Sequence, residues 1–279
     1  MDRGHAGVHR EAGASVRFLV VEDQMLNGLT AVVTGGTAGI GRACAEALLA
    51  AGAGAVLING RDRNRAETAR AEVQARFPNA TVVVAIGDLA RPQVACDVMA
   101  EAMKRLGRID LLVNSTGGND TPRLLHQTAV EEIPGILERC LFAQILSSRA
   151  ALPYMREAKR GAIINIASDA AKIPTPGESV IGAAMAGIVM FTRGLAVEGK
   201  RDGIRANVLT PSMTSGTEHF ERIMTDPWAG KMFAKAEKMA ALGVVSKEEL
   251  AGLVVFLASP AAAKITGQAI SMTGGISAL

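Results

Sequence analysis

The chain has 279 residues, of which 49% are apolar and 20% charged, so it is not an intrinsically disordered protein and is long enough for one large domain with a sizeable core. The 30 basic and 27 acidic side chains are interspersed and leave a net charge of +3, so no basic stripe indicates a nucleic-acid partner. No apolar run reaches the ~20 residues of a membrane span, and we therefore expect a small-molecule partner, no nucleic acid and no membrane.

From residue 25 onward the chain alternates between apolar runs and helix-like segments. Residues 1–24 carry scattered charges and are expected to be an N-terminal extension, in which His5 and His9 are better explained by a solvated tail than by a metal site. Continuous apolar runs are typical of parallel strands covered on both faces. They predict strands at 29–33, 55–59, 81–86, 109–113, 162–167, 205–209 and 269–272. The intervening segments predict helices at about 42–51, 64–77, 92–106, 135–156, 179–198 and 247–257.

This alternation predicts an α/β fold, a Rossmann-type doubly wound parallel sheet in a single three-layer domain over residues 25–279. Residues at about 214–245 interrupt the rhythm with an irregular, partly helical segment. Long excursions in a compact domain are usually functional, so we expect a substrate lid there. Apolar side chains in and beside this segment predict an apolar ligand: Met213, Phe220, Met224, Trp228, Met232 and Phe233.

A glycine-rich stretch, TGGTAGIG at residues 34–41, follows the first strand and opens the first helix. Unpaired N–H groups and the macrodipole make a helix N-terminus favourable for a pyrophosphate. Gly35 permits the sharp turn, Gly39 lets phosphates approach the backbone, and Gly41 lets the helix pack against the strand. Because this turn begins a βαβ unit, it predicts dinucleotide binding.

These motifs, in this order, resemble the short-chain dehydrogenase/reductase (SDR) family from residue 26 to residue 275. TGGTAGIG resembles the family's glycine motif, Asp88 its adenine-contacting aspartate, and Asn114 with Gly117 its NNAG motif. GIRANVLTP and ITGQAISMTGG resemble its later signatures. The resemblance implies an oxidoreductase that binds its cofactor through Gly35, Thr37, Gly39, Ile40, Gly41, Arg61, Asp88, Leu89, Asn114, Gly117 and Pro211.

The end of the second strand bears on the choice between NADP and NAD. An NAD-binding member of this fold has an acidic side chain there, whereas a 2′-phosphate needs a cation. Here Gly60 stands at that position and Arg61 follows, and a guanidinium suits a phosphate. NADP is therefore the expected cofactor. NAD remains the alternative, because Arg61 could be a solvated arginine and Ala38 stands where NADP-binding relatives often carry a basic residue.

The resemblance implies four catalytic positions: a serine, a tyrosine, a lysine and an asparagine. Ser168 occupies the serine position, but Ile181, Met185 and Cys140 occupy those of the tyrosine, lysine and asparagine. The sole tyrosine, Tyr154, ends a helix that the family's fold places on the other side. Isoleucine and methionine cannot donate a proton, and a missing general acid is worth roughly 10²–10⁴-fold in rate.

Four residues near the expected site are candidate replacements: Lys172, Glu178, Asp169 and Cys140. Asp169 and Glu178 belong to a pattern that also occurs in family members that keep the tyrosine, so they do not by themselves indicate a new mechanism. A solvated loop lysine and a packed thiol are the simpler interpretations of Lys172 and Cys140. The motif after Pro211 is altered too, since the position of the family's threonine falls at Gly216.

Three hypotheses follow. The first is an NADP-linked oxidoreductase of a small apolar carbonyl or alcohol with an unusual proton path. The second is a catalytically inactive nucleotide-binding homologue or partner subunit, and the third is a non-redox enzyme that uses the same pocket. The family resemblance also implies a homodimer or homotetramer, formed through the helices at about 135–156 and 179–198.

Three cysteines bear on location: Cys44, Cys96 and Cys140 lie in helix-like segments. An odd number of cysteines in such segments is typical of reduced thiols. The sequence also lacks an apolar segment followed by a small-residue cleavage site near its start. We therefore expect a cytoplasmic protein without a metal site.

Overall fold

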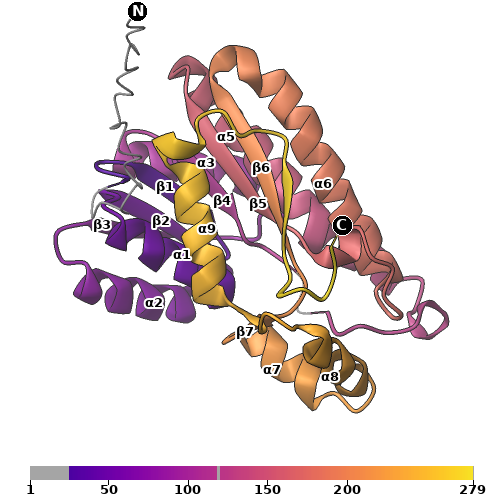
Figure 1. The fold of residues 1–279 in the computed structure, drawn as a ribbon. Helices are drawn as coiled ribbons and strands as arrows, with labels where there is room; N and C mark the ends of the chain where they lie inside the picture. Colours follow the sequence, from indigo (N-terminus) through magenta and orange to yellow (C-terminus); the bar gives the residue numbers. More distant parts are fainter. Residues whose placement is uncertain (1–24, 118–119, 279) are drawn as a thin grey trace, which may run out of the picture.

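Seven parallel strands form the central sheet of the computed structural model, which describes residues 25–117 and 120–278 (Figure 1). The strand order is β3-β2-β1-β4-β5-β6-β9, so the direction of winding reverses between β1 and β4. In open α/β sheets such a reversal creates a crevice at the carboxyl ends of the strands. The strands are β1 (Thr30–Thr34), β2 (Ala55–Gly60), β3 (Thr81–Ile86), β4 (Leu111–Asn114), β5 (Gly161–Ile166), β6 (Ile204–Pro211) and β9 (Ala269–Met272).

Helices cover both faces of this sheet, which confirms the predicted doubly wound α/β fold (Figure 1). One face carries α1 (Gly39–Ala50), α2 (Arg63–Arg76) and α9 (Lys247–Ala258), and the other carries α3 (Pro92–Leu106), α5 (Ala143–Glu157) and α6 (Ser179–Gly199). Successive strand side chains point to opposite faces, so Val33 packs in the first core and Val32 in the second. Continuous apolar strands are therefore buried on both sides.

The helix predicted at about 135–156 is longer and is not regular. It begins as α4 (Glu132–Leu137), passes through a π-helical turn (Glu138–Phe142) and continues as α5. The apolar spacing of the sequence does not reveal the extra residue of such a turn. The turn buries the side chain of Cys140, in keeping with the frequent occurrence of π turns at functional sites.

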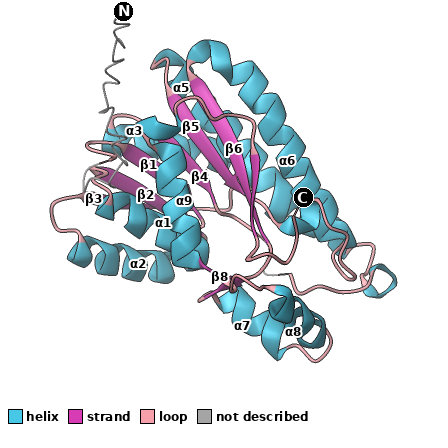
Figure 2. Cartoon of the chain, in the orientation of Figure 1, coloured by secondary structure: helices cyan, strands magenta, loops and turns pink. Residues whose placement is uncertain are grey.

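The segment predicted as a lid forms its own small lobe beyond the carboxyl edge of the sheet (Figure 2). It contains α7 (Glu218–Thr225) and α8 (Ala229–Met239). Its two ends pair as a short parallel ladder, β7 (Thr214–Ser215) with β8 (Val245–Ser246). This ladder fixes the base of the lobe, so the helices between its ends are held as one unit.

Helix α6 is the one described helix that is long and apolar enough to cross a membrane by length and composition. Arg193 and Glu198 interrupt the apolar run of this helix. One side of α6 is part of the core, with Ala184 and Ile188 fully buried. Packing against the sheet therefore accounts for the apolar residues on this side of α6. The extension expected at residues 1–24 lies outside the described residues.

Candidate functional site

A cleft of about 490 Å³ opens at the carboxyl ends of the strands, at the reversal between β1 and β4. Its walls come from the glycine-rich turn, the ends of β2, β3 and β5, the start of α6, and the lid helices α7 and α8. The fold thus brings together segments from across the whole domain. One end is lined by the glycine-rich turn and the end of β2, and the other by Ser168, Ile181 and Met185.

The glycine-rich turn provides a cradle of backbone N–H groups. Helix α1 begins at Gly39 after Ala38, whose backbone is extended and whose side chain makes no capping bond. The first turn of α1 holds no acidic residue. Its unpaired N–H groups therefore remain able to bind an anion. A Cβ at Gly39 would clash with no protein atom, and its nearest neighbour would be the Thr217 methyl group at 3.8 Å. The residues present fit a dinucleotide pyrophosphate.

The other two glycines of the turn serve the backbone. Gly35 lies at a φ of 63°, and a Cβ there would come within 2.5 Å of the Ser115 carbonyl oxygen. Gly41 does not line the cleft, and a Cβ on it would strike the carbonyl group of Gly35. Only glycine allows α1 to pack this closely against the turn, which sets the position of the cradle.

The end of β2 carries positive charge into the cleft. Gly60 packs under Thr37, and the exposed Arg61 makes no ion pair with any described residue. Asp62 is occupied as the N-cap of α2, where its carboxylate accepts the Arg65 N–H at 2.7 Å. The Arg65 side chain also lines the cleft and forms an ion pair with Glu218 on the lid.

Arg65 was not among the residues predicted from the sequence. It lies in the first turn of α2, just after the end of β2, and that closeness to Arg61 along the chain was the available signal. Two guanidinium groups therefore lie at the end of the cleft where β2 offers no carboxylate for ribose hydroxyls.

Asp88, Leu89 and Gly117 line the cleft as well, but Asn114 lies behind it. Asn114 is fully buried, and its amide donates to Asn165 Oδ1 at 2.8 Å and to Ser148 Oγ at 2.9 Å. Its carbonyl oxygen accepts the Ser147 hydroxyl at 2.7 Å. The side chain of Asn114 therefore ties β4 to β5 and α5 instead of reaching into the cleft.

The far end of the cleft contains the positions compared with the catalytic residues of the SDR family. Ser168, Ile181, Met185, Cys140 and Pro211 all line it. The Ser168 Oγ accepts the Ala170 N–H at 3.2 Å, which leaves the hydroxyl proton for a group in the cleft. Among the described residues that line the cleft there is neither a tyrosine nor a lysine.

The sole tyrosine and two of the proposed replacements lie elsewhere. Tyr154 packs against the core on the α3 and α5 face. Lys172 donates through Nζ to Ser271 Oγ on β9. Asp169 is buried and accepts the Ser277 hydroxyl at 2.7 Å. Of the four candidates, Glu178 and Cys140 line the cleft.

The carboxyl group of Glu178 has a strongly raised pKa. Burial raises the pKa of its carboxyl to about 7, and the neighbouring charge of Asp169 acts in the same direction, while a hydrogen bond with Thr175 opposes them. His219 on the lid shifts too, because burial and Arg222 lower its pKa. Its buried Nδ1 has no partner among the described residues. No group of three or more His, Cys, Asp or Glu side chains in the described part of the chain is placed to hold a metal ion.

The lid supplies apolar surface only in part. Of the six apolar residues predicted from the sequence, Met213, Phe220 and Phe233 line the cleft, and Met224, Trp228 and Met232 do not. Ile223, which was not predicted, lines it as well. Trp228 packs its ring against Gly177 in the loop before α6. The lid therefore contacts the segment that carries Glu178.

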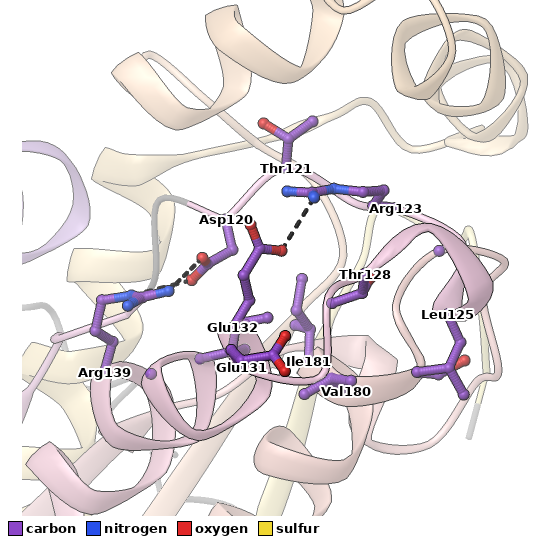
Figure 3. Close-up of a pocket in the computed structure, with 14 residues that line it drawn as sticks. Asp120, Thr121, Arg123, Leu125, Thr128, Glu131, Glu132, Arg139, Val180 and Ile181 are labelled. Carbon is purple, nitrogen blue, oxygen red and sulfur yellow. Dashed lines mark hydrogen bonds and ion pairs between the residues drawn. The ribbon is translucent and has the colours of Figure 1, made fainter.

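A second cavity of about 280 Å³ adjoins the cleft beyond Ile181 (Figure 3). Asp120, Arg139 and Ile181 line both spaces. Two ion pairs cross this region, Arg139 with Asp120 at 2.6 Å and Arg123 with Glu132 at 3.0 Å. The space next to the cleft is thus more polar than the lid side.

Comparison with known proteins identifies the ancestry of this arrangement. Residues 29–228 match the family model described as short chain dehydrogenase. The chain is 35% identical over 251 residues to 2,3-dihydroxy-2,3-dihydro-p-cumate dehydrogenase of Pseudomonas putida, covering 90% of this chain and 95% of that protein. It is 34% identical over 265 residues to D-beta-hydroxybutyrate dehydrogenase of Cupriavidus necator, covering 90% and 98%.

Solved structures agree with this ancestry. A dehydrogenase/reductase from Sinorhizobium meliloti superposes with a TM-score of 0.81 at 29% identity, covering 92% of this chain and 98% of the other. The family match, the relatives and the shared fold lead to one conclusion: this chain belongs to the short-chain dehydrogenase/reductase family of oxidoreductases, whose members bind NAD(P).

Proposed function

We propose that this protein binds NADP and oxidises or reduces a small apolar alcohol or carbonyl compound, with a proton path that does not use tyrosine and lysine. The observation that carries the proposal is the pair of guanidinium groups, Arg61 and Arg65, at the end of a cleft whose β2 strand ends in glycine. A 2′-phosphate suits such a pair, whereas ribose hydroxyls favour a carboxylate.

Different lining residues would bind different parts of the cofactor. The N–H groups at the start of α1 would hold the pyrophosphate, Arg61 and Arg65 the 2′-phosphate, and Asp88 with Leu89 the adenine end. When bound, the nicotinamide supplies or accepts a hydride. Gly117 and Pro211 line the wall toward Ser168, where the reacting carbonyl would lie.

The substrate end combines apolar walls with a few polar groups, among them Ser168 and Glu178. Ser168 offers a hydroxyl proton to a carbonyl oxygen. Ile181, Met185, Met213 and Phe220 surround it with hydrocarbon and thioether groups. Such a pocket fits a small, largely apolar substrate, whose oxygen the Ser168 hydroxyl would orient. The named relatives are dehydrogenases of hydroxylated compounds, in keeping with this chemistry.

A second candidate function is a nucleotide-binding homologue or partner subunit without turnover. It is favoured by Ile181 and Met185, since neither side chain can handle a proton or hold a charge. Both functions need the same cofactor cradle. They differ only in whether another residue in the cleft moves the proton.

Two measurements, nucleotide binding and carbonyl turnover, distinguish the oxidoreductase from the inactive homologue. NADPH and NADH are titrated by fluorescence into the parent and into Arg61→Ala, with Arg63→Ala as the control because Arg63 lies on α2 outside the cleft. We expect Arg61→Ala to weaken NADPH binding about 10-fold or more, since hydrogen bonds to charged groups contribute ~1.5–3 kcal/mol, and to change NADH binding little. Equal losses for both nucleotides would contradict the NADP assignment.

A carbonyl screen then compares the parent with the Ile181→Tyr, Met185→Lys double variant. Turnover by the parent supports the oxidoreductase and rejects the inactive homologue. Turnover by the double variant alone rejects the proposed activity of the parent, because only the restored pair would then provide the proton.

We also propose a homodimer or homotetramer contact on α5 and α6, where Phe142, directly before α5, and Met190 and Val197 on α6 are exposed. We place the protein in the cytoplasm, since Cys44, Cys96 and Cys140 form no disulfide.

A further inference from the structure

We propose that Glu178 is the proton donor and acceptor of this site, in the role for which the cleft has no tyrosine. The inference rests on the proposed function, because it assigns a residue to that same redox reaction. Its basis is geometric. Glu178 lines the cleft together with Ser168 and Ile181, and it stands directly before the first turn of α6.

The carboxyl group is not used to hold the helix. Glu178 is the N-cap residue of α6, a position whose side chain commonly accepts an N–H from the first turn. Here the Glu178 side chain makes no such bond. Ile181 is the third residue of this helix, and both Glu178 and Ile181 line the cleft.

The backbone that carries Glu178 is fixed from two sides. Gly177 has a φ of 84° and its carbonyl oxygen accepts the Arg123 N–H at 2.9 Å. A Cβ on Gly177 would come within 2.7 Å of the Trp228 ring, which shows how closely the lid packs there. The loop after β4 and the lid thus clamp this segment, so the carboxyl is positioned before substrate arrives.

Burial gives this carboxyl a pKa of about 7, whereas an ordinary glutamic acid is fully ionised at neutral pH. A general acid or base works best when its pKa lies near the operating pH. The other titratable groups that line this end of the cleft are Asp120, Arg139, Cys140 and His219. Arg139 is paired with Asp120, and Asp169 adds a negative charge close to Glu178.

His219 is a weaker candidate for the same role. Burial lowers its pKa, so its ring is neutral at pH 7 and lacks the acidic proton that a carbonyl oxygen needs. A buried carboxyl shifts the other way and keeps its proton. Among the cleft groups with shifted pKa values, Glu178 is the one that lies at the substrate end and still carries an acidic proton near neutral pH.

In reduction, the carbonyl carbon gains a C–H bond by accepting hydride from the reduced nicotinamide cofactor, which is thereby oxidised. The electron pair of the C=O π bond moves to oxygen, and this oxygen takes the proton as the Glu178 O–H bond breaks. The product is an alcohol, and the Glu178 carboxylate regains a proton from water. Oxidation of an alcohol runs through the same atoms in reverse.

The test uses the full chain and a carbonyl substrate found in the screen. Glu178→Gln is compared with Glu178→Asp and with Glu198→Gln, an exposed glutamate at the other end of the same helix. We expect Glu178→Gln to lower kcat roughly 10²–10⁴-fold while NADPH binding changes less than about threefold. Glu178→Asp should recover part of the rate, and Glu198→Gln should match the parent.

Two further readouts separate proton transfer from a structural role. The parent's kcat for reduction should fall as pH rises through about 7, and the residual activity of Glu178→Gln should lose that dependence. Without cofactor, infrared difference spectra between about pH 6 and pH 8 should show a protonated carboxyl band that disappears as Glu178 ionises, and Glu178→Gln should lack it.

The outcomes distinguish the inference from the proposed function. A kcat of Glu178→Gln within about threefold of the parent's, or a Glu178 carboxyl that is already ionised at pH 6, overturns the inference and leaves the oxidoreductase standing. A parent that binds NADPH but reduces no carbonyl overturns both. A kcat loss with an unchanged pH profile assigns Glu178 a structural role and rejects proton transfer.

Discussion

At the scale of single residues, two positions determine what the cleft can bind and catalyse: Gly39, which has no side chain, and Glu178, in a cleft that has no tyrosine. The start of α1 needs a glycine at Gly39, because a Cβ there would occupy space that a bound phosphate would require. The substrate end needs a proton, and the structure offers the carboxyl of Glu178 where the family resemblance led us to look for tyrosine. Each of these features can be tested with one substitution.

Replacing Gly39 with alanine should weaken NADPH and NADH binding at least ~10-fold, because the methyl group would clash with no protein atom but would take up space that the pyrophosphate needs. Gly39 has a φ of 52°, so the backbone strain costs about 1–2 kcal/mol of stability. Gly28→Ala is the matched control, since Gly28 has a φ of 69°, open surroundings and no place in the cleft. Thermal unfolding should shift alike in both variants, and nucleotide titration should change only for Gly39→Ala.

Glu178 should also make stability depend on pH. Its folded pKa of about 7 lies above its ordinary value of 4.5, so the unfolded chain gives up the proton first as pH rises. Stability is therefore lost between about pH 4.5 and 7, by up to ~3 kcal/mol. Urea unfolding of Glu178→Gln against the parent should show a difference that grows in favour of glutamine across this window. A difference independent of pH would contradict the raised pKa.

At the scale of elements, the lid is connected to the rest of the domain at several points. Its base is the β7–β8 ladder, Trp228 packs on Gly177, and Glu218 on α7 forms an ion pair with Arg65 on α2. The last contact bridges the end of the cleft where the guanidinium groups lie. The Glu218 carboxylate would compete with a 2′-phosphate for Arg65.

Glu218→Gln should therefore raise NADPH affinity severalfold more than NADH affinity, because it frees Arg65 and removes a negative charge from the phosphate end. Stability should change by less than ~1 kcal/mol, since both partners are largely exposed. Glu221→Gln is the control, on the same helix but outside the cleft. Titrations at low and high salt check the charge effect, which should shrink as salt rises. An unchanged ratio of the two affinities would show that Arg65 does not meet the 2′-phosphate.

At the scale of the whole molecule, helix α6 has two apolar sides. One packs in the core, while Met190 and Val197 on the other are 65% and 64% exposed. Exposed large apolar side chains on a helix that covers a sheet are typical of an interface. This surface is where we place the contact between subunits.

The Met190→Glu, Val197→Glu double variant should become a monomer, because each charge would have to be buried without a partner. Light scattering after size exclusion measures the mass. Met239→Glu serves as the control, since Met239 is 59% exposed on the lid helix α8, away from α5 and α6. A parent that is already monomeric, or a double variant that remains oligomeric, would reject this interface.

Apolar periodicity and turn residues were enough to predict most elements of this chain. The strands at 81–86 and 269–272 and the helix at 92–106 have the bounds that the sequence indicated, and other strand ends differ by one or two residues. The π turn around Cys140 escaped prediction, because one additional residue in a helix leaves no mark in the spacing of apolar side chains.

What the amino-acid sequence by itself determined was the order of strands and helices and the glycine-rich turn, since both follow from local backbone preferences and short-range patterns. Only the tertiary structure decided which polar groups share a cleft. In the folded protein, Glu178 and Arg65 line the cleft, whereas Asn114 and Lys172 form hydrogen bonds outside it. The physical reason is that burial, ionisation and pairing depend on neighbours that are remote along the chain, such as Trp228 at Gly177 and Glu218 at Arg65.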